Sequence, residues 1–261
     1  MRLEISALTS LPEVQRGDDL AQLIREAASQ GREPIDGSVI LAVAQKIVSK
    51  AEGAVVDLRT IRPSALAESW ASAWDKDPRL IELILSQSKR IVKMDRGVLI
   101  AETRHGFVCA NAGVDQSNLQ ANMQANTLAN LQANTEGDEF ATILPENPDL
   151  SARRLCAALR CGAVIITDTF GRPWREGLVD IAVGVAGLEA VQDCRGSVDR
   201  RGRKLAGTIL AVADQLAAAA GLLMVKSGGF PVVCIRGYEW RAATTGSARA
   251  LIRNPQDDLF R

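Results

Sequence analysis

The stretch AVIITDTFGRPWREG, residues 163–177, begins with β-branched and other apolar residues and ends in a polar segment. A continuous apolar run of this length is typical of a strand that is buried on both faces. Asp168 and Thr169 follow the run, so we expect them just past the end of a buried strand. Because a carboxylate and a hydroxyl supply oxygen ligands, this position suits Mg²⁺ or a similar hard cation.

Two arginines, Arg172 and Arg175, follow within the same stretch. Their planar guanidinium groups match the geometry of phosphate or carboxylate. The alternative for the whole segment is an Asx-turn beside solvated arginines, and the segment alone does not choose between the two interpretations.

Two other polar clusters follow apolar segments. NAGVDQSN, residues 111–118, places Asp115 and Asn118 together, and carboxylates from different parts of a fold commonly hold a metal that bridges phosphates. AQKIVSKAEG, residues 44–53, places Lys46 and Lys50 four residues apart, so one helical turn would bring both ammonium groups to the same side. They either attract a polyanion or belong to a solvated surface face.

Elsewhere the sequence alternates between helix-like and strand-like segments. We expect helices from Asp18 or Asp19 to about Gln30, over 64–74 and 78–87, from Pro148–Asp149, and around 208–223. We expect buried strands over 38–44 and 231–238, and a hairpin over 90–103. The pattern predicts a mixed α/β (α+β) fold with mixed sheets and flanking helices, as one domain over residues 1–261 or as two interleaved subdomains.

The composition restricts the function. The chain has 261 residues, of which 47% are hydrophobic, and it carries 31 basic and 31 acidic residues. Because the chain has no net charge, we do not expect it to bind nucleic acid or anionic membranes. The N-terminus has no apolar signal segment and no stretch is long enough for a membrane helix, so we expect a cytoplasmic protein.

The common catalytic and nucleotide motifs are absent. Five scattered cysteines predict buried, reduced thiols and neither a disulfide framework nor a zinc site. His105 is the only histidine, which argues against a Ser/His/Asp or Cys/His mechanism; we expect a structural role for it. No G-x-x-x-x-G-K-[ST] or dinucleotide fingerprint occurs.

Taken together, the motifs resemble one family. SLPEVQRGDDL, AQKIVSKAEG, HGFVCANAGVDQSN, LPENPD and ITDTFGRPWREG occur in an order that is similar to the coenzyme F420:L-glutamate ligases, the gamma-glutamyl ligases of deazaflavin cofactor synthesis. The resemblance covers nearly the whole chain. It implies an unusual α/β fold and a homodimer. It also implies a reaction that uses GTP and a divalent cation, Mg²⁺ or Mn²⁺, to add L-glutamate to the acidic tail of F420-0 or its glutamylated forms. K⁺ is a further candidate cation. Some members carry a second, flavin-binding domain, and we expect this chain to be the ligase domain alone.

The resemblance also implies roles for individual residues. Asp115, Asp168 and Thr169 match metal ligands, and nucleotide-binding positions match Gln45, Lys46, Lys50, Asn118 and the N-terminal loop Leu11, Pro12, Glu13 and Val14. With the metal ligands Asp115 and Asp168, the arginines Arg172 and Arg175 complete the expected catalytic set. Lys226 is a departure, because some relatives have a Gln or Glu near the metal at this position, and an ammonium group cannot ligate Mg²⁺.

Such a ligase would transfer the γ-phosphoryl group of GTP to a carboxylate and form an acyl phosphate that the glutamate amine attacks. Phosphoryl transfer depends on positioning and charge neutralisation, which metals, lysines and arginines supply without histidine. Two alternatives remain: a related ligase for another anionic acceptor, or a non-catalytic deazaflavin-binding protein.

An Asn/Gln/Ala-rich repeat, residues 119–134, separates the DQSN motif from LPENPD. Its NLQA-like units account for the length by which this segment exceeds the corresponding one in relatives. Slippage of a short coding repeat explains it, and a lid over the nucleotide or deazaflavin is the functional alternative.

Overall fold

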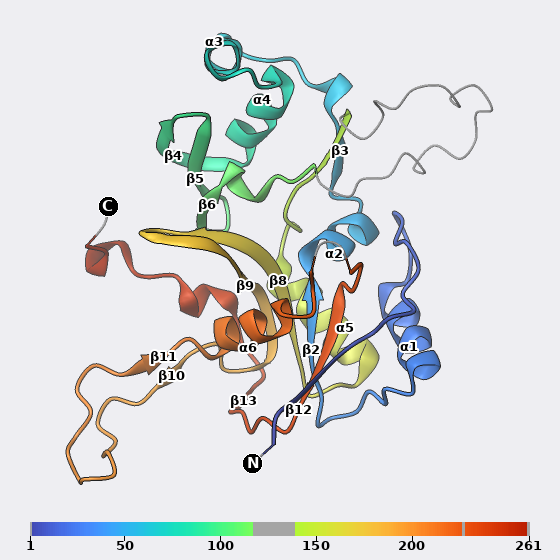
Figure 1. Cartoon of the computed structure of the whole chain (residues 1–261), viewed down its shortest axis with the longest axis vertical. Coiled ribbons are helices and arrows are strands. Elements are labelled where there is room, and N and C mark those ends of the chain that lie inside the picture. The colour runs from blue at the N-terminus through green and yellow to red at the C-terminus, as the bar shows by residue number, and fades with distance from the viewer. Residues whose placement is uncertain (1, 117–138, 226–227, 260–261) are drawn as a thin grey trace. The chain divides into compact units, whose positions relative to one another are not determined.

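The computed structural model describes residues 2–116, 139–225 and 228–259. The mixed α/β architecture predicted from the sequence is confirmed, with helices beside several separate sheets (Figure 1). The chain divides into two compact units. Unit 1 consists of Met1–Glu13, Asp19–Gln45 and Asn147–Arg261, and unit 2 of Val14–Asp18 and Lys46–Glu146. The predicted domain organisation, one domain or two interleaved subdomains, stays a prediction.

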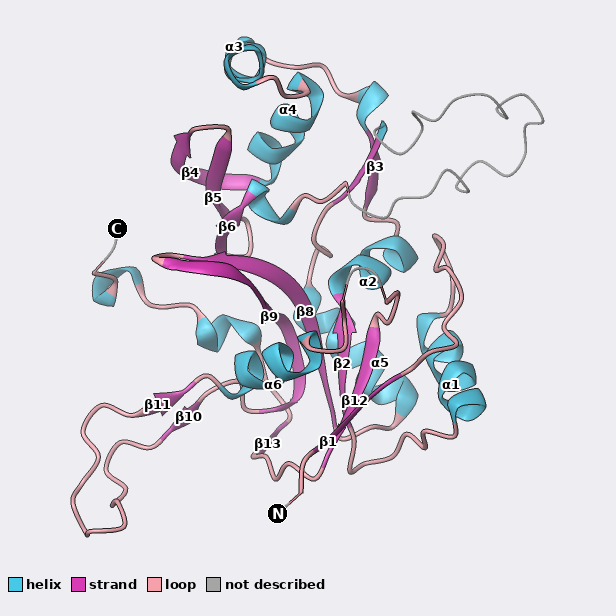
Figure 2. Cartoon of the chain, in the orientation of Figure 1, coloured by secondary structure: helices cyan, strands magenta, loops and turns pink. Residues whose placement is uncertain are grey.

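Unit 1 contains a six-stranded sheet (Figure 2). Its strands lie in the order β1 (Glu4–Ala7), β12 (Val232–Arg236), β2 (Ile40–Ala44), β8 (Ala163–Arg172), β9 (Arg175–Leu188) and β13 (Ala242–Ala243). Only β2 and β8 are parallel neighbours in this sheet. Both begin with fully buried apolar residues, which explains their uninterrupted apolar sequences. A short ribbon of β10 (Gln192–Asp193) and β11 (Ile209–Leu210) also belongs to unit 1.

Three helices accompany this sheet: α1 (Leu20–Gly31), α5 (Pro148–Leu159) and α6 (Val212–Gly221). The predicted start of α1 is confirmed, because the Asp19 carboxylate accepts a hydrogen bond of 3.0 Å from the Gln22 backbone N–H. α5 begins at the predicted proline. The expected helix over 208–223 was too long at its start, because residues 209–210 pair with β10 before α6 begins.

Helices α5 and α6 pack on opposite faces of β8 and β9. Gly184 lies opposite Ile166, and a side chain at Gly184 would collide with Pro148 of α5. The next residue of β8, Thr167, points to the other face, where its hydroxyl lies 3.6 Å from the Met224 sulfur just after α6. The two faces of β8 are therefore distinguished by the helix that covers each.

Unit 2 contains two small sheets and the remaining helices. The strands are β3 (Val55–Asp57) with β7 (Phe140–Thr142), and β4 (Ser88–Asp95), β5 (Val98–Thr103) and β6 (Val108–Ala110). The helices are α2 (Gln45–Glu52), whose first residue belongs to unit 1, α3 (Ala65–Trp74) and α4 (Pro78–Gln87). Short 3₁₀ helices are η1 (Leu58–Thr60) and η2 (Asn111–Gly113) in unit 2, and η5 (Ala248–Leu251) and η6 (Pro255–Asp257) in unit 1. The predicted helices over 64–74 and 78–87 and the β4–β5 hairpin are confirmed.

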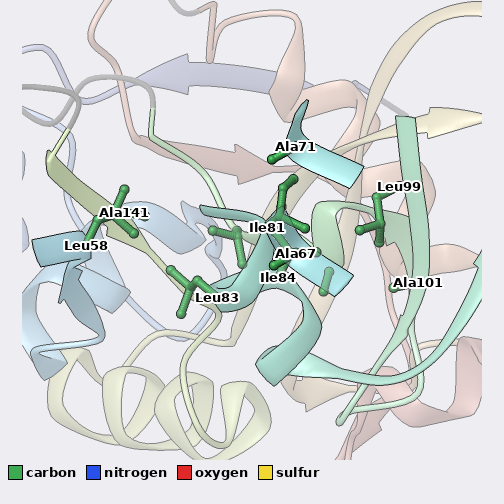
Figure 3. Packing of buried hydrophobic residues seen from close by; sticks show 11 residues of the cluster. Leu58, Ala67, Ala71, Ile81, Leu83, Ile84, Leu99, Ala101 and Ala141 are labelled. Atoms are coloured by element: carbon green, nitrogen blue, oxygen red, sulfur yellow. The ribbon is translucent and has the colours of Figure 1, made fainter. Parts of the chain in front are cut away.

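A hydrophobic cluster forms the core of unit 2 (Figure 3). Figure 3 shows Ile81 and Ile84 of α4 beside Ala67 of α3, and the cluster also includes Ala112 and Val114. Val114 immediately precedes Asp115 in the sequence, and Ala112 lies two residues before Val114. Burial of their side chains therefore fixes the backbone that carries the Asp115 carboxylate.

The expectation of buried thiols holds for only some of the cysteines. Cys109, Cys161 and Cys234 are buried, whereas Cys156 and Cys194 are partly exposed. Cys156 lies within helix α5, and Cys194 directly follows strand β10. Among the described residues, no helix is long and apolar enough to cross a membrane.

Candidate functional site

Helix α2 follows the buried strand β2 directly and carries three of the predicted nucleotide-binding residues. The side chains of Lys46 and Lys50 are one helical turn apart, as the spacing predicted. Gln45 is 2% exposed and Lys50 is 7% exposed. The interpretation of Lys50 as part of a solvated face is therefore wrong, because this turn of α2 is packed against the protein.

The loop before Asp115 has an unusual backbone. Asn111, Ala112 and Gly113 have φ angles of 55°, 52° and 73°, all in the left-handed region. This conformation costs a non-glycine residue about 1–2 kcal/mol, so packing must hold the loop in place. Such strained backbones cluster at functional sites.

Backbone hydrogen bonds then fix Asp115 itself. Its N–H donates to the Thr142 carbonyl at 3.0 Å, and the Thr142 N–H donates back to the Asp115 carbonyl at 2.8 Å. The Thr142 hydroxyl donates to the same carbonyl at 3.0 Å. The side chain of Asp115 is thus presented from a segment with little backbone freedom.

Lys46 and Asp115 meet in an ion pair. The Lys46 Nζ atom lies 2.9 Å from Asp115 Oδ2, and the two side chains are 17% and 34% exposed. Because solvent reaches this pair only in part, its charges are screened less than those of a surface pair. The structure thereby brings a predicted phosphate-binding cation and a predicted metal ligand together within unit 2. Asn118 lies outside the described residues.

Asp168 and Thr169 lie within β8, and the prediction that they follow the end of a strand is wrong. The apolar run ends at Ile166, but β8 continues to Arg172 because it remains paired with β9. Alternation along the strand places Asp168 on the same face as Ile166, and Thr169 on the face of Thr167 that α6 covers. Asp168 Oδ1 accepts a hydrogen bond of 2.9 Å from the Thr169 backbone N–H.

Thr169 has a cross-strand partner that sequence reasoning missed. Asp180 of β9 lies directly opposite it, and the Thr169 hydroxyl donates a hydrogen bond of 2.7 Å to Asp180 Oδ1. The two residues are eleven positions apart in the sequence. In the sequence, Asp180 stands out only as the single polar residue of the otherwise apolar segment 178–183.

Arg172 and Arg175 face each other at the closed end of the β8–β9 hairpin. Pro173 and Trp174 form the turn, and Trp174 has a φ of 59°. The Arg172 guanidinium donates to the Glu176 carbonyl at 2.7 Å. Like charges directly opposite each other destabilise a strand pair, so an anion between them would be stabilising, as the predicted phosphate or carboxylate role requires.

The N-terminal loop residues are divided between the two units. Leu11, Pro12 and Glu13 belong to unit 1, and Val14, which is 3% exposed, belongs to unit 2. Their contact with a nucleotide stays a prediction.

Two further carboxylates have structural roles in unit 1. Asp149, in the first turn of α5, accepts backbone hydrogen bonds from Val185 and Ala248, each of 2.9 Å. Asp214, in the first turn of α6, accepts one from Ala182 at 2.9 Å, and burial raises the pKa of its carboxyl group above the ordinary value. In the sequence, both residues are recognisable only as acidic residues in the first turn of a helix, where they are commonly found.

His105 contacts backbone carbonyls. Its Nε2 atom lies 3.0 Å from the Pro145 oxygen, and its ring stacks on Phe107. These contacts hold the ring within unit 2, and the structural role expected of His105 stays a prediction.

The predicted metal ligands of each unit carry oxygen donors, the kind of atom that a hard cation binds. No group of three His, Cys, Asp or Glu side chains within the described ranges could hold a metal ion by itself. Asp115, Asp168 and Thr169 nevertheless offer oxygen donors, and Mg²⁺ is commonly held by one or two carboxylates together with substrate phosphates. Lys226 lies outside the described residues.

Comparison with known proteins identifies the class. Residues 9–237 match the family described as F420-0:Gamma-glutamyl ligase. The match covers most of the chain, including the β8–β9 hairpin and the Lys46–Asp115 pair. The chain therefore belongs to the F420-0:gamma-glutamyl ligase family.

Individual relatives carry a more specific name. A protein of Methanothermobacter thermautotrophicus named Coenzyme F420:L-glutamate ligase is 42% identical, with the alignment covering 100% of both chains. Proteins of the same name from Methanopyrus kandleri and Methanocaldococcus jannaschii are 42% and 40% identical, over 95% and 87% of this chain and 93% and 86% of their own.

Proposed function

We propose that this protein is a GTP-dependent ligase that adds L-glutamate, through γ-linkages, to coenzyme F420-0 or its glutamylated forms. The name of the relatives supports the acceptor and the amino acid. The observation that carries the site assignment is the 2.9 Å pair of Lys46 with Asp115 on a strained loop. A nearby cation and carboxylate are what a site for a metal–nucleotide complex needs.

The reaction proceeds in two steps. An acceptor carboxylate oxygen attacks the γ-phosphorus of GTP, the bond to the β-phosphate oxygen breaks, and GDP leaves. The glutamate amine then attacks the acyl carbon, inorganic phosphate leaves, and the amine gives up its proton as the amide forms. Lys46, Lys50, Arg172 and Arg175 bind and orient the anionic groups, and they offset the negative charge that builds up during transfer.

Asp115, Asp168 and Thr169 would hold Mg²⁺ or Mn²⁺, which supplies Lewis-acid stabilisation of the phosphate oxygens when bound. Gln45, Asn118 and the loop Leu11, Pro12, Glu13 and Val14 complete the proposed nucleotide site. K⁺ as a further cation and a homodimeric state also belong to the proposal. Sedimentation equilibrium checks the second of these.

The metal assignment is tested with Asp168→Asn. The substitution preserves size but removes one negative charge, so GDP release that depends on glutamate and F420-0 should fall by at least about 100-fold, with an unchanged thermal unfolding midpoint. Asp193→Asn is the matched control, because Asp193 is an exposed carboxylate that pairs with Arg195. An Asp168→Asn variant with normal activity at ordinary metal concentration would remove Asp168 from the mechanism.

The order of events is tested without glutamate. Enzyme, GTP, Mg²⁺ and F420-0 should form a small amount of acyl phosphate, which hydroxylamine traps as a hydroxamate. Replacing the five cysteines by Ala or Ser should leave the trapped product. If trapping required Cys109, a thioester route would replace the proposed one.

A further inference from the structure

The hydrogen bond between Thr169 and Asp180 assigns the proton of the Thr169 hydroxyl. A hydroxyl has one proton and two lone pairs. At 2.7 Å the Thr169 Oγ1 atom donates to Asp180 Oδ1, because an ionised carboxylate can only accept. The Thr169 hydroxyl therefore donates its proton to Asp180, and the lone pairs of Thr169 Oγ1 can bind another partner.

Asp180 is held in place by the surrounding elements of unit 1. The ladder of β8 and β9 places it directly opposite Thr169. On the other side of the carboxylate, Oδ2 faces Gly221 at the end of α6, where a Cβ atom would collide with it. The absence of a side chain at Gly221 thus allows the end of α6 to approach the carboxylate.

The charge of Asp180 is not compensated within the described part of the chain. Among those residues, no lysine or arginine forms an ion pair with Asp180. No ion pair among these residues therefore competes with the Thr169 hydroxyl for the Asp180 carboxylate.

We propose that Asp180 is a positioning residue of the metal site, which orients the Thr169 hydroxyl so that its oxygen can ligate a divalent cation. This inference rests on the proposed function, in which Thr169 is a metal ligand. Asp180 acts through Thr169 and does not touch the cation. Groups that orient a metal ligand in this way typically contribute about 10- to 100-fold to metal affinity.

The test measures metal affinity and does not depend on turnover. Mn²⁺ alone is titrated into the protein, and free Mn²⁺ is followed by electron paramagnetic resonance. Asp180→Ala should weaken Mn²⁺ binding by about 10-fold or more. Asp180→Asn should recover most of the affinity, because its amide oxygen still accepts from Thr169. Asp193→Ala is the control for loss of an exposed carboxylate in the same unit.

A double-mutant cycle then separates orientation from direct ligation. Thr169→Val removes the hydroxyl, so adding Asp180→Asn or Asp180→Ala to it should have no further effect on Mn²⁺ affinity. Unchanged binding by Asp180→Ala, additive effects in the cycle, or equal losses in Asp180→Asn and Asp180→Ala would each overturn the inference. If Asp180→Ala does not fold, the cycle with Asp180→Asn decides.

Failure of the proposed function has a different signature. In that case the wild-type protein would release no GDP with glutamate and F420-0, whatever the Mn²⁺ affinities of the Asp180 and Thr169 variants.

Discussion

Lys50 carries a positive charge in surroundings that exclude most solvent. Lys50 as a whole residue is 7% exposed, whereas the side chain of Lys93 is 70% exposed. The stem of a buried lysine packs against its neighbours. Its buried ammonium group has polar partners, which would lose their interactions if the side chain were removed. Lys50 therefore contributes to folding as well as to the proposed binding of phosphate.

We predict that Lys50→Ala weakens GTP binding and also lowers the free energy of unfolding by about 1–3 kcal/mol. Lys50→Met should weaken GTP binding equally but lose less stability, because it keeps most of the stem. Calorimetric GTP titration and urea denaturation measure the two quantities. Lys93→Ala, the exposed control, should change neither, and normal GTP affinity in both Lys50 variants would exclude the ammonium group from the nucleotide site.

Cys156 and Cys161 interact where α5 ends. The Cys156 sulfur lies 3.3 Å from the Cys161 carbonyl oxygen. A hydrogen bond with the Cys161 thiol lowers the pKa of Cys156 to about 7, and the same interaction, together with burial, raises the pKa of Cys161. Cys156 should therefore be the more reactive thiol of the two near neutral pH.

The rate of Cys156 alkylation by iodoacetamide should rise with pH and reach half its maximum near pH 7, because a lowered pKa makes the thiolate available at lower pH. Mass spectrometry of the modified peptide measures the rate. In Cys161→Ala the midpoint should move up towards the ordinary value of 9.0. An unchanged midpoint would show that the Cys161 thiol does not stabilise the thiolate.

At the scale of elements, the β8–β9 hairpin joins a buried and an exposed part in one continuous ribbon. Ile165 and Ile166 are fully buried, while Trp174 at the turn is 81% exposed. The left-handed conformation of Trp174 follows Pro173, as in a turn that favours glycine at its third position. The strain of this turn is therefore not offset by burial of the indole ring.

Trp174→Gly should raise the free energy of unfolding by about 1 kcal/mol, because glycine adopts a positive φ without the steric cost. Thermal or urea denaturation measures the change. Trp174→Ala is the matched control, since it removes the ring but keeps the strain, and it should not stabilise. Equal stability of the two variants would show that the backbone at this position is not strained.

At the scale of the whole molecule, the described residues on either side of the repeat insertion are paired with each other within unit 2. Asp115, before the insertion, pairs with Thr142, after it, through two backbone hydrogen bonds. The repeat itself, residues 119–134, lies outside the described residues. Because the free energy of closing a connection depends only weakly on its length, removing the repeat should not disturb this pairing.

Deleting residues 119–134 should shift the unfolding midpoint by no more than about 3 °C, since a change of this size in loop length alters the closure free energy by only about 0.8 kcal/mol. The Michaelis constants for GTP and F420-0 should also stay the same if the repeat arose by slippage. A large rise in either constant, with an unchanged midpoint, would assign the repeat a role in substrate binding.

The sequence by itself determined most of the elements, because their signals are local. The Asp19 cap, the prolines that begin α4 and α5, and the apolar runs of β2 and β8 depend on a few neighbouring residues. The motifs around Asp115 and Asp168 also determined the family, since their residues and order are read directly from the chain.

Only the tertiary structure decided which of these residues meet and how exposed they are. The end of β8 depends on its pairing with β9, so the positions of Asp168 and Thr169 within the strand could not be read from the apolar run. The burial of Lys50, the pair of Lys46 with Asp115, and the hydrogen bond from Thr169 to Asp180 are contacts between segments distant in sequence or consequences of their packing. Charge and hydrogen-bonding capacity belong to a residue, but partners and solvent exposure are set by the chain segments that fold around it.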